Sequence, residues 1–220
     1  MRIGLFGGSF DPVHCGHLAA VEAVSKGLQL DRCHLIPTAI PPHKNPVALA
    51  PAEQRLRMIE MATAGRPCLV VSTLEIERSG PSYTIDTVKD FTASQEAEDD
   101  LILAMGFDAF MEIDTWKSYR RLFDLVQVAV LFRRDADSPV AAEQVQAVER
   151  QLRAAVADGY AAAGGGRFVH RRLKTVHFVA FDSPHISSTA IRARCRRGKS
   201  LDGLVPGAVA AHIQQKGLYR

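Results

Sequence analysis

Short apolar runs rich in β-branched residues alternate with longer helical patterns, and this alternation restricts the possible folds more than any other feature of the chain. The expected strands are Arg2–Phe6, Cys33–Pro37, Leu69–Thr73, Leu101–Ala104, Val126–Phe132 and Val176–Ala180. The helical patterns between them are His17–Lys26, Ala52–Ala64, Ile85–Ala93 and Trp116–Leu125. Such βαβ units predict an α/β fold, a Rossmann-like doubly wound parallel sheet with helices on both faces and ligands at the carboxyl ends of the strands.

Residues 134–175 depart from this rhythm. A helix is expected over Val140–Asp158, and three consecutive glycines follow at Gly164–Gly166. About 40 residues dominated by one amphipathic helix bury too little surface for a core of their own, so we expect a peripheral helical excursion with a hinge. Two further helical patterns, Ser188–Arg197 and Pro206–Lys216, predict a C-terminal helical segment. We therefore expect one domain over residues 1–220.

The composition is that of a globular protein and excludes several classes. Charged residues make up 23% and hydrophobic ones 47%, which argues against disorder, collagen and coiled coils. A net charge of +3 and basic runs without interleaved aromatic residues give no sign of a nucleic-acid partner. The cysteines are scattered and no apolar run reaches the ~18 residues of a membrane span, so we expect a cytoplasmic protein with reduced thiols that does not bind membranes.

The end of the first expected strand concentrates the polar chemistry. Gly7 and Gly8 let the backbone approach a phosphate, and the helix that follows offers unpaired N–H groups. His14 and His17 stand one helical turn apart at its start, where both rings can reach one anionic group. Two other interpretations stay open: capping or packed imidazoles, and a metal site with Cys15, for which no further ligand is evident.

The segment Gly7-Gly8-Ser9-Phe10-Asp11-Pro12-Val13-His14-Cys15-Gly16-His17 resembles the opening of the bacterial nicotinate-mononucleotide adenylyltransferases, and its H-x-G-H element marks their wider nucleotidyltransferase superfamily. Later segments resemble that family's motifs in the same order: Pro41-Pro42-His43-Lys44, Pro81-Ser82-Tyr83-Thr84, Gly106-x-Asp108, Trp116-Lys117, Ile186-Ser187-Ser188-Thr189-x-Ile191-Arg192 and Gly217-Leu218-Tyr219-Arg220. The resemblance covers nearly the whole chain.

The resemblance implies a reaction and a set of site residues. ATP and nicotinate mononucleotide would give deamido-NAD and pyrophosphate, with Mg²⁺ accompanying ATP and His14, His17 and Arg192 as catalytic residues. It implies that ATP is bound by Gly7, Gly8, Ser9, Phe10, His14, His17, Gly106, Asp108, Ile186, Ser187, Ser188 and Arg192. It implies that nicotinate mononucleotide is bound by Lys44, Tyr83, Thr84 and Trp116, and it names no protein metal ligand.

The residues themselves leave alternatives beside this assignment. Ser187 and Ser188 precede an apolar run as in any capped helix, and Arg192 fits a solvated face as well as a phosphate. Trp116 recurs with Tyr119 and Phe123 at a spacing typical of a packed core. A transferase with another acceptor, such as nicotinamide mononucleotide or phosphopantetheine, and a nucleotide-binding module without turnover both stay open. The sequence also leaves open whether the chain forms a homo-oligomer.

Overall fold

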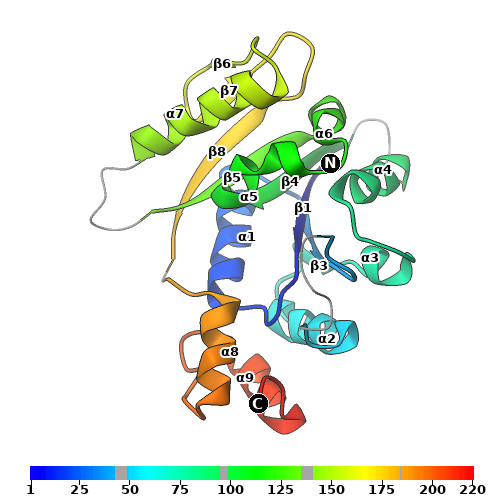
Figure 1. Ribbon diagram of the computed structural model, residues 1–220, viewed down its shortest axis with the longest axis vertical. Coiled ribbons are helices and arrows are strands. Elements are labelled where there is room, and N and C mark those ends of the chain that lie inside the picture. The colour runs from blue at the N-terminus through cyan, green and yellow to red at the C-terminus, as the bar shows by residue number, and fades with distance from the viewer. Residues whose placement is uncertain (43–48, 95–98, 135–140, 184) are drawn as a thin grey trace.

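The computed structural model describes residues 1–42, 49–94, 99–134, 141–183 and 185–220. Its sheet has the strand order β3-β2-β1-β4-β5-β8-β7-β6, in which the six strands from β3 to β8 run parallel (Figure 1). The expected α/β fold with a doubly wound parallel sheet is confirmed. The chain winds outward from β1 in both directions, so the topological switch point lies between β1 and β4, where open α/β sheets bind their ligands.

All six expected strands are present, with boundaries shifted by a few residues. The parallel strands are β1 (Arg2–Gly8), β2 (Arg32–Pro37), β3 (Leu69–Val71), β4 (Asp100–Gly106), β5 (Gln127–Arg134) and β8 (Val176–Asp182). The helices are α1 (Cys15–Gly27), α2 (Ala52–Thr63), α3 (Leu74–Glu77), α4 (Thr84–Ser94), α5 (Phe107–Met111), α6 (Tyr119–Leu125), α7 (Ala141–Gln151), α8 (Ser188–Arg196) and α9 (Gly207–Lys216).

Helices cover both faces of the sheet because alternate residues of each strand are apolar on opposite sides. On one face, Phe6 and Ile102 of the strands pack with residues of α1, α2, α8 and α9. On the other, Leu5 and Leu103 pack with residues of α4, α5, α6 and α7. The described helices include none long and apolar enough to cross a membrane.

The segment that departs from the βαβ rhythm adds two strands that the sequence did not predict. After α7 and a π-helical turn (Leu152–Val156), β6 (Ala161–Ala162) and β7 (Arg167–Val169) form an antiparallel hairpin beside β8. The three glycines expected as a hinge make the turn of this hairpin, with φ between 59° and 74°. Tyr160 and Phe168 are buried in the same cluster as the strands, which fixes the segment against the sheet.

The helix expected over Trp116–Leu125 begins three residues later, at Tyr119. Ser118 has a φ of 51°, in the left-handed region, and this interrupts the backbone between a short 3₁₀ turn (Ile113–Thr115) and α6. Trp116 therefore lies in a connection and not on a helix. The two C-terminal helices are confirmed: α8 and α9 pack at the lower end of the molecule in Figure 1, and Gly217 ends α9 with a φ of 61°.

Candidate active site

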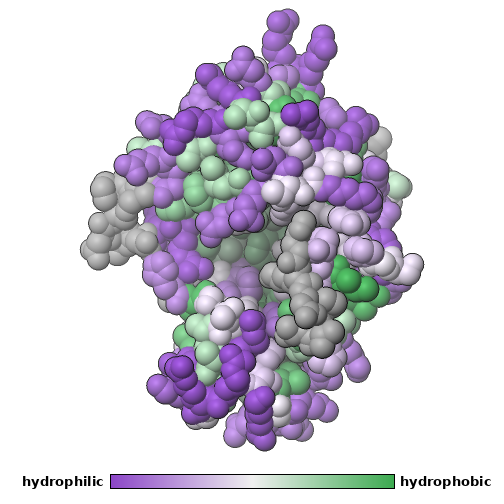
Figure 2. Space-filling view, viewed as in Figure 1, coloured by the Kyte–Doolittle hydropathy of each residue, from purple (hydrophilic) through white to green (hydrophobic). Residues whose placement is uncertain are grey.

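A cleft of about 840 Å³ opens at the carboxyl ends of β1, β4 and β5, on both sides of the switch point. The space-filling view shows a recess near the middle of this face, with hydrophobic residues at its bottom (Figure 2). Residues at the N-termini of α1, α4 and α8 line the cleft together with the ends of the strands. Three helix starts around one recess favour an anionic ligand, because each brings the positive end of a helix dipole to it.

Most of the predicted site residues line this cleft: Gly7, Gly8, Ser9, His14, His17, Tyr83, Thr84, Gly106, Asp108, Trp116, Ile186, Ser187 and Ser188. Lys44 lies outside the described residues. Of the described ones, Phe10 and Arg192 are not part of the lining. Phe10 is 1% exposed and packs edge-to-face against the His17 ring, with 5.1 Å between the ring centroids, so it supports the histidine from behind.

His14 and His17 cap α1 by bonding to each other's backbone. The N–H of His17 donates to Nδ1 of His14, and the N–H of His14 donates to Nδ1 of His17, both at 3.2 Å. The rings stack with 3.6 Å between their centroids. Gly16 leaves room for this stack, since a Cβ there would lie 3.1 Å from Nδ1 of His14. The capping alternative from the sequence is therefore correct, but it also orients both rings at the cleft.

Capping determines which nitrogen carries the proton in the neutral form of each ring. An Nδ1 that accepts a hydrogen bond carries no proton, so each neutral imidazole carries its proton on Nε2 and is a hydrogen-bond donor there. Burial, and secondly the positive charge of Arg133, lower the pKa of His14 to about 4. The arrangement therefore presents His14 as a neutral N–H donor at neutral pH.

This pKa makes the stability of the protein depend on pH. The unfolded chain binds a proton at His14 below about pH 6.5, whereas the folded chain does so only near pH 4, so stability is lost as the pH falls between these values. We expect His14 to contribute a decrease of about 3 kcal/mol in the free energy of unfolding, measured by urea denaturation. His14→Asn keeps an acceptor at the N-cap without titrating and should flatten this part of the profile. An identical pH slope in that variant would show that His14 does not cause it.

The start of α8 meets the loop between β1 and α1. Ser187 caps the helix by accepting from the N–H of Ala190 at 3.2 Å. The Ser188 hydroxyl donates to the Pro12 carbonyl at 2.9 Å, and Nη1 of Arg192 donates to the Asp11 carbonyl at 2.8 Å. The two predicted phosphate-binding segments therefore border one cleft, but Arg192 is held by the loop beneath it. Its catalytic role stays a prediction.

Asp11 connects four parts of the chain behind the cleft. It is 2% exposed, and its Oδ1 accepts from the Tyr219 hydroxyl at 2.8 Å and from the N–H of Ala50 at 3.1 Å. Its Oδ2 lies 3.5 Å from Nη1 of Arg192. Arg55, 1% exposed, donates from Nη1 to the Ser9 carbonyl at 2.8 Å. This network fixes the loop that carries His14.

The start of α4 forms the other end of the cleft. Tyr83 and Thr84 line it beside Trp116, which packs partly against the core and keeps part of its surface in the cleft. Nζ of Lys117 lies 4.4 Å from the centre of the Tyr83 ring and donates to Asp86 at 2.9 Å. An aromatic surface next to a helix N-terminus suits a flat ring that carries an anionic group.

Gly106 and Asp108 complete the cleft at the switch point. Gly106 ends β4 in an extended conformation and is the N-cap residue of α5, and Asp108 lies exposed in the first turn of that helix. Among the described residues, none is hydrogen-bonded or ion-paired to the Asp108 carboxylate. Its position at the end of a strand beside the crossover is where related folds accept ribose hydroxyls.

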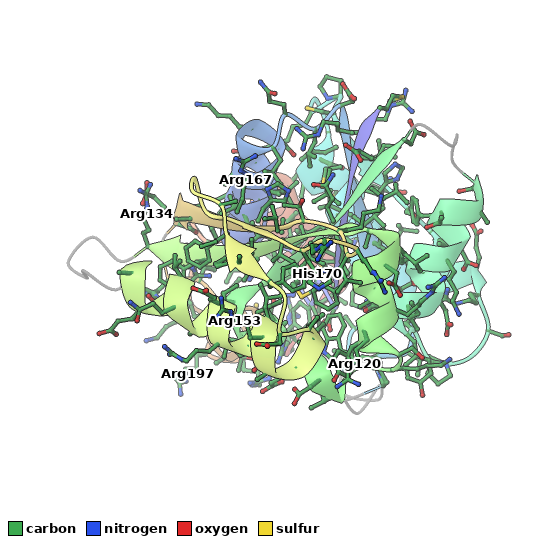
Figure 3. All side chains as sticks on the ribbon, turned by 90° about the horizontal axis from the view of Figure 1, so that it is seen from above. Arg120, Arg134, Arg153, Arg167, His170 and Arg197 are labelled. Carbon is green, nitrogen blue, oxygen red and sulfur yellow. The ribbon has the colours of Figure 1, made fainter. Side chains whose placement is uncertain are left out.

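Sequence reasoning missed several charged residues of the cleft, among them Arg133, Glu75 and Glu112. Arg133 lies at the end of β5 and lines the cleft, whereas its neighbour Arg134 points outward and pairs with Asp182 (Figure 3). The alternation of strand residues was the available signal, because it sends only one of two consecutive arginines inward. Glu75 in the four-residue helix α3 also lines the cleft, and no motif or periodicity indicated it.

Comparison with known proteins agrees with this geometry. The model of the cytidylyltransferase-like family matches residues 5–194. A protein of Desulfatibacillum aliphaticivorans named "Probable nicotinate-nucleotide adenylyltransferase" is 39% identical over 219 residues, which is 100% of both chains. One of the same name from Pseudomonas fluorescens is 42% identical over 100% of this chain and 97% of its own length.

Solved structures share the fold at much lower identity. The Plasmodium falciparum nicotinic acid mononucleotide adenylyltransferase complexed with NaAD has a TM-score of 0.71 at 14% identity, over 99% of this chain and 97% of that one. The full-length matches to bacterial relatives, the family model and the site geometry agree with one another. The chain therefore belongs to the cytidylyltransferase-like family, and within it to the nicotinate-nucleotide adenylyltransferases.

Proposed function

We propose that the protein transfers the adenylyl group of ATP to nicotinate mononucleotide, which releases pyrophosphate and yields nicotinate adenine dinucleotide. The main support for this reaction is a single cleft with two chemically different ends. One end, suited to phosphate, is built on the stacked His14–His17 pair, and the other is aromatic and lies at the start of α4. The identity of 39–42% with full-length relatives of that name supports the same reaction.

We place the two substrates by the chemistry of the two ends. The triphosphate and ribose of ATP would lie against Gly7–Ser9, the histidine pair, Ile186–Ser188 and Gly106–Asp108. The pyridine ring would lie against Trp116, with its carboxylate at the N-terminus of α4 beside Tyr83 and Thr84, and Lys44 would approach the phosphate. The two substrates then meet at the switch point.

The reaction needs no nucleophile from the protein. An oxygen of the mononucleotide phosphate attacks the α-phosphorus of ATP in line, a new P–O bond forms, and the bond to pyrophosphate breaks. The Nε2–H groups of His14 and His17 would donate to phosphate oxygens whose negative charge grows in the transition state. Because the capping bonds fix both rings in advance, little reorganisation is needed at the moment of reaction.

We propose that Mg²⁺ enters with ATP as part of the substrate. The described residues contain no group of three or more His, Cys, Asp or Glu side chains placed to hold a metal ion. Mg²⁺ is commonly held by one or two carboxylates together with phosphates and water, so the triphosphate would supply most of its ligands. When bound, the ion neutralises phosphate charge.

An acceptor panel tests the assignment. With ATP and magnesium, we expect pyrophosphate release to give the highest kcat/KM with nicotinate mononucleotide, above nicotinamide mononucleotide and phosphopantetheine. Mixtures without an acceptor give the background rate. A higher value with another acceptor would make the protein a related transferase, and ATP binding without release for any acceptor would make it a binding module.

The cellular location and the oligomeric state of the protein stay predictions. The four cysteines are all unpaired in the structure, which is consistent with the expected reducing cytoplasm. Sedimentation of the purified protein would show whether it forms the homo-oligomer that the sequence left open.

A further inference from the structure

Glu75 is a buried carboxyl group at the aromatic end of the cleft. It lies on α3, is 6% exposed and lines the cleft. Its Oε1 accepts from the Thr87 hydroxyl at 2.7 Å, and Ser82 lies beside the carboxyl group. Its Oε2 is buried and has no hydrogen-bond partner in the described part of the chain. One oxygen is thus held by the protein while the other has no partner.

The partners of Glu75 are the residues that shape the start of α4. Ser82 precedes the helix and is anchored to the loop after β2, since its N–H donates to the Ile40 carbonyl at 2.9 Å and its hydroxyl accepts from the N–H of Ala39 at 3.2 Å. Thr87 lies one turn into the helix and also lines the cleft. Glu75 therefore lies beside the helix start where we place the substrate carboxylate.

The surroundings of Glu75 bear on its protonation. Burial raises its pKa, while the hydroxyl groups of Thr87 and Ser82 and the positive charge of Arg78 oppose that rise. Arg78 is already engaged, because Nη1 pairs with Asp90 at 2.8 Å and Nη2 donates to Thr87 at 3.0 Å. When Glu75 is neutral, Oε1 accepts from Thr87 and the proton lies on Oε2, which leaves an O–H donor without a protein acceptor.

We propose that Glu75 is a specificity-determining residue that, as a neutral carboxyl group, donates its Oε2 proton in a hydrogen bond to the carboxylate of nicotinate mononucleotide. The proposal rests on the proposed function and adds to it a reason for selecting the acid over the amide. An ionised Glu75 has the opposite effect, because it repels a carboxylate and accepts from the amide N–H of nicotinamide mononucleotide.

Two substitutions separate hydrogen bonding from charge. Glu75→Gln keeps an acceptor for Thr87 and offers a permanent N–H donor, so the affinity for nicotinate mononucleotide should stay within about 3-fold of the unmodified protein. Glu75→Met removes the donor at similar volume and should lower that affinity by roughly 10–100-fold, the value of a hydrogen bond to a charged group. The affinity for nicotinamide mononucleotide should change much less, so the ratio of the dissociation constants of the two mononucleotides is the quantity to compare between variants.

Quenching of tryptophan fluorescence measures both affinities directly, because Trp116 is the only tryptophan and lines the cleft. Glu77→Gln is the matched control: Glu77 lies two residues on in the same helix, exposed and bonded to Thr73 at 2.6 Å, and its replacement should leave the ratio unchanged. Thermal unfolding shows that each variant is folded. If Glu75→Met lowers the affinity for both mononucleotides to the same degree, Glu75 has only a structural role and the proposal is overturned.

A gain of more than 10-fold in the affinity of Glu75→Gln for nicotinate mononucleotide would also overturn the proposal, because such a gain would show that Glu75 is charged in the unmodified protein. These outcomes differ from failure of the proposed function. If the unmodified protein makes no dinucleotide from nicotinate mononucleotide, the function is wrong. If it does so and the ratio is unmoved by Glu75→Met, only the role of Glu75 is wrong.

Discussion

Replacing His17 with alanine should lower kcat by about 10²–10³-fold, which corresponds to about 2.7–4 kcal/mol of lost transition-state stabilisation. The His17 ring is stacked on His14 and held by a hydrogen bond from the His14 backbone, so its Nε2–H is oriented before ATP binds. Its removal deletes a donor to the phosphate oxygens where charge develops. Steady-state pyrophosphate release at saturating ATP and nicotinate mononucleotide measures the effect.

The alanine also removes half of the capping pair of α1, which costs about 0.5–2 kcal/mol of stability. His17→Gln separates the two contributions, because glutamine at this helix position restores a capping acceptor and lacks the stacked imidazole. We expect its unfolding to resemble that of the unmodified protein while kcat stays at least 10²-fold lower. His212, bonded to Gln54 away from the cleft, provides a histidine control. Turnover in His17→Ala within a few-fold of normal would exclude His17 from the mechanism.

The fold could be predicted from sequence wherever local pattern and tertiary environment agree. The six parallel strands are buried on both faces, so they are continuous apolar runs that are visible without a structure. The β6–β7 hairpin was missed because its strands have two and three residues, include two alanines and flank a run of glycines. Its stability comes from pairing with β8 and from the burial of Phe168, which no local pattern reveals.

The same distinction between local pattern and tertiary environment applies to the site. The histidine pair and Ser187 are local features of helix starts, and the sequence identified them. Helical spacing shows which residues share a face but not what faces them, so it left Arg192 open between a phosphate and solvent, and only the structure shows its bond to the Asp11 carbonyl. Glu75 and Arg133 reach the cleft only through tertiary contacts. Asp11 was part of a quoted motif, but its partners Ala50 and Tyr219 are 39 and 208 residues away.

The loss of Asp11 should destabilise the protein strongly, because its carboxyl group holds those distant partners. Asp11→Ala removes a carboxylate, 2% exposed, that pairs with Arg192 at 3.5 Å and whose negative charge also acts on the guanidinium of Arg55, itself 1% exposed. Breaking a buried ion pair at one partner costs about 3–5 kcal/mol, because an uncompensated charge stays buried. We expect a loss of that size in the free energy of unfolding from urea denaturation.

Two variants show whether charge causes this loss. Tyr219→Phe removes only the hydroxyl that donates to Asp11 and should cost about 1 kcal/mol, the value of one hydrogen bond. Asp11→Asn keeps the size and an acceptor but not the charge, so its loss should lie between the other two. Equal losses in Asp11→Ala and Tyr219→Phe would contradict the ionic explanation. The same carboxyl group fixes the loop below His14. The order of the three losses in stability should therefore also be the order in which kcat falls, which links the buried cluster to the geometry of the reaction.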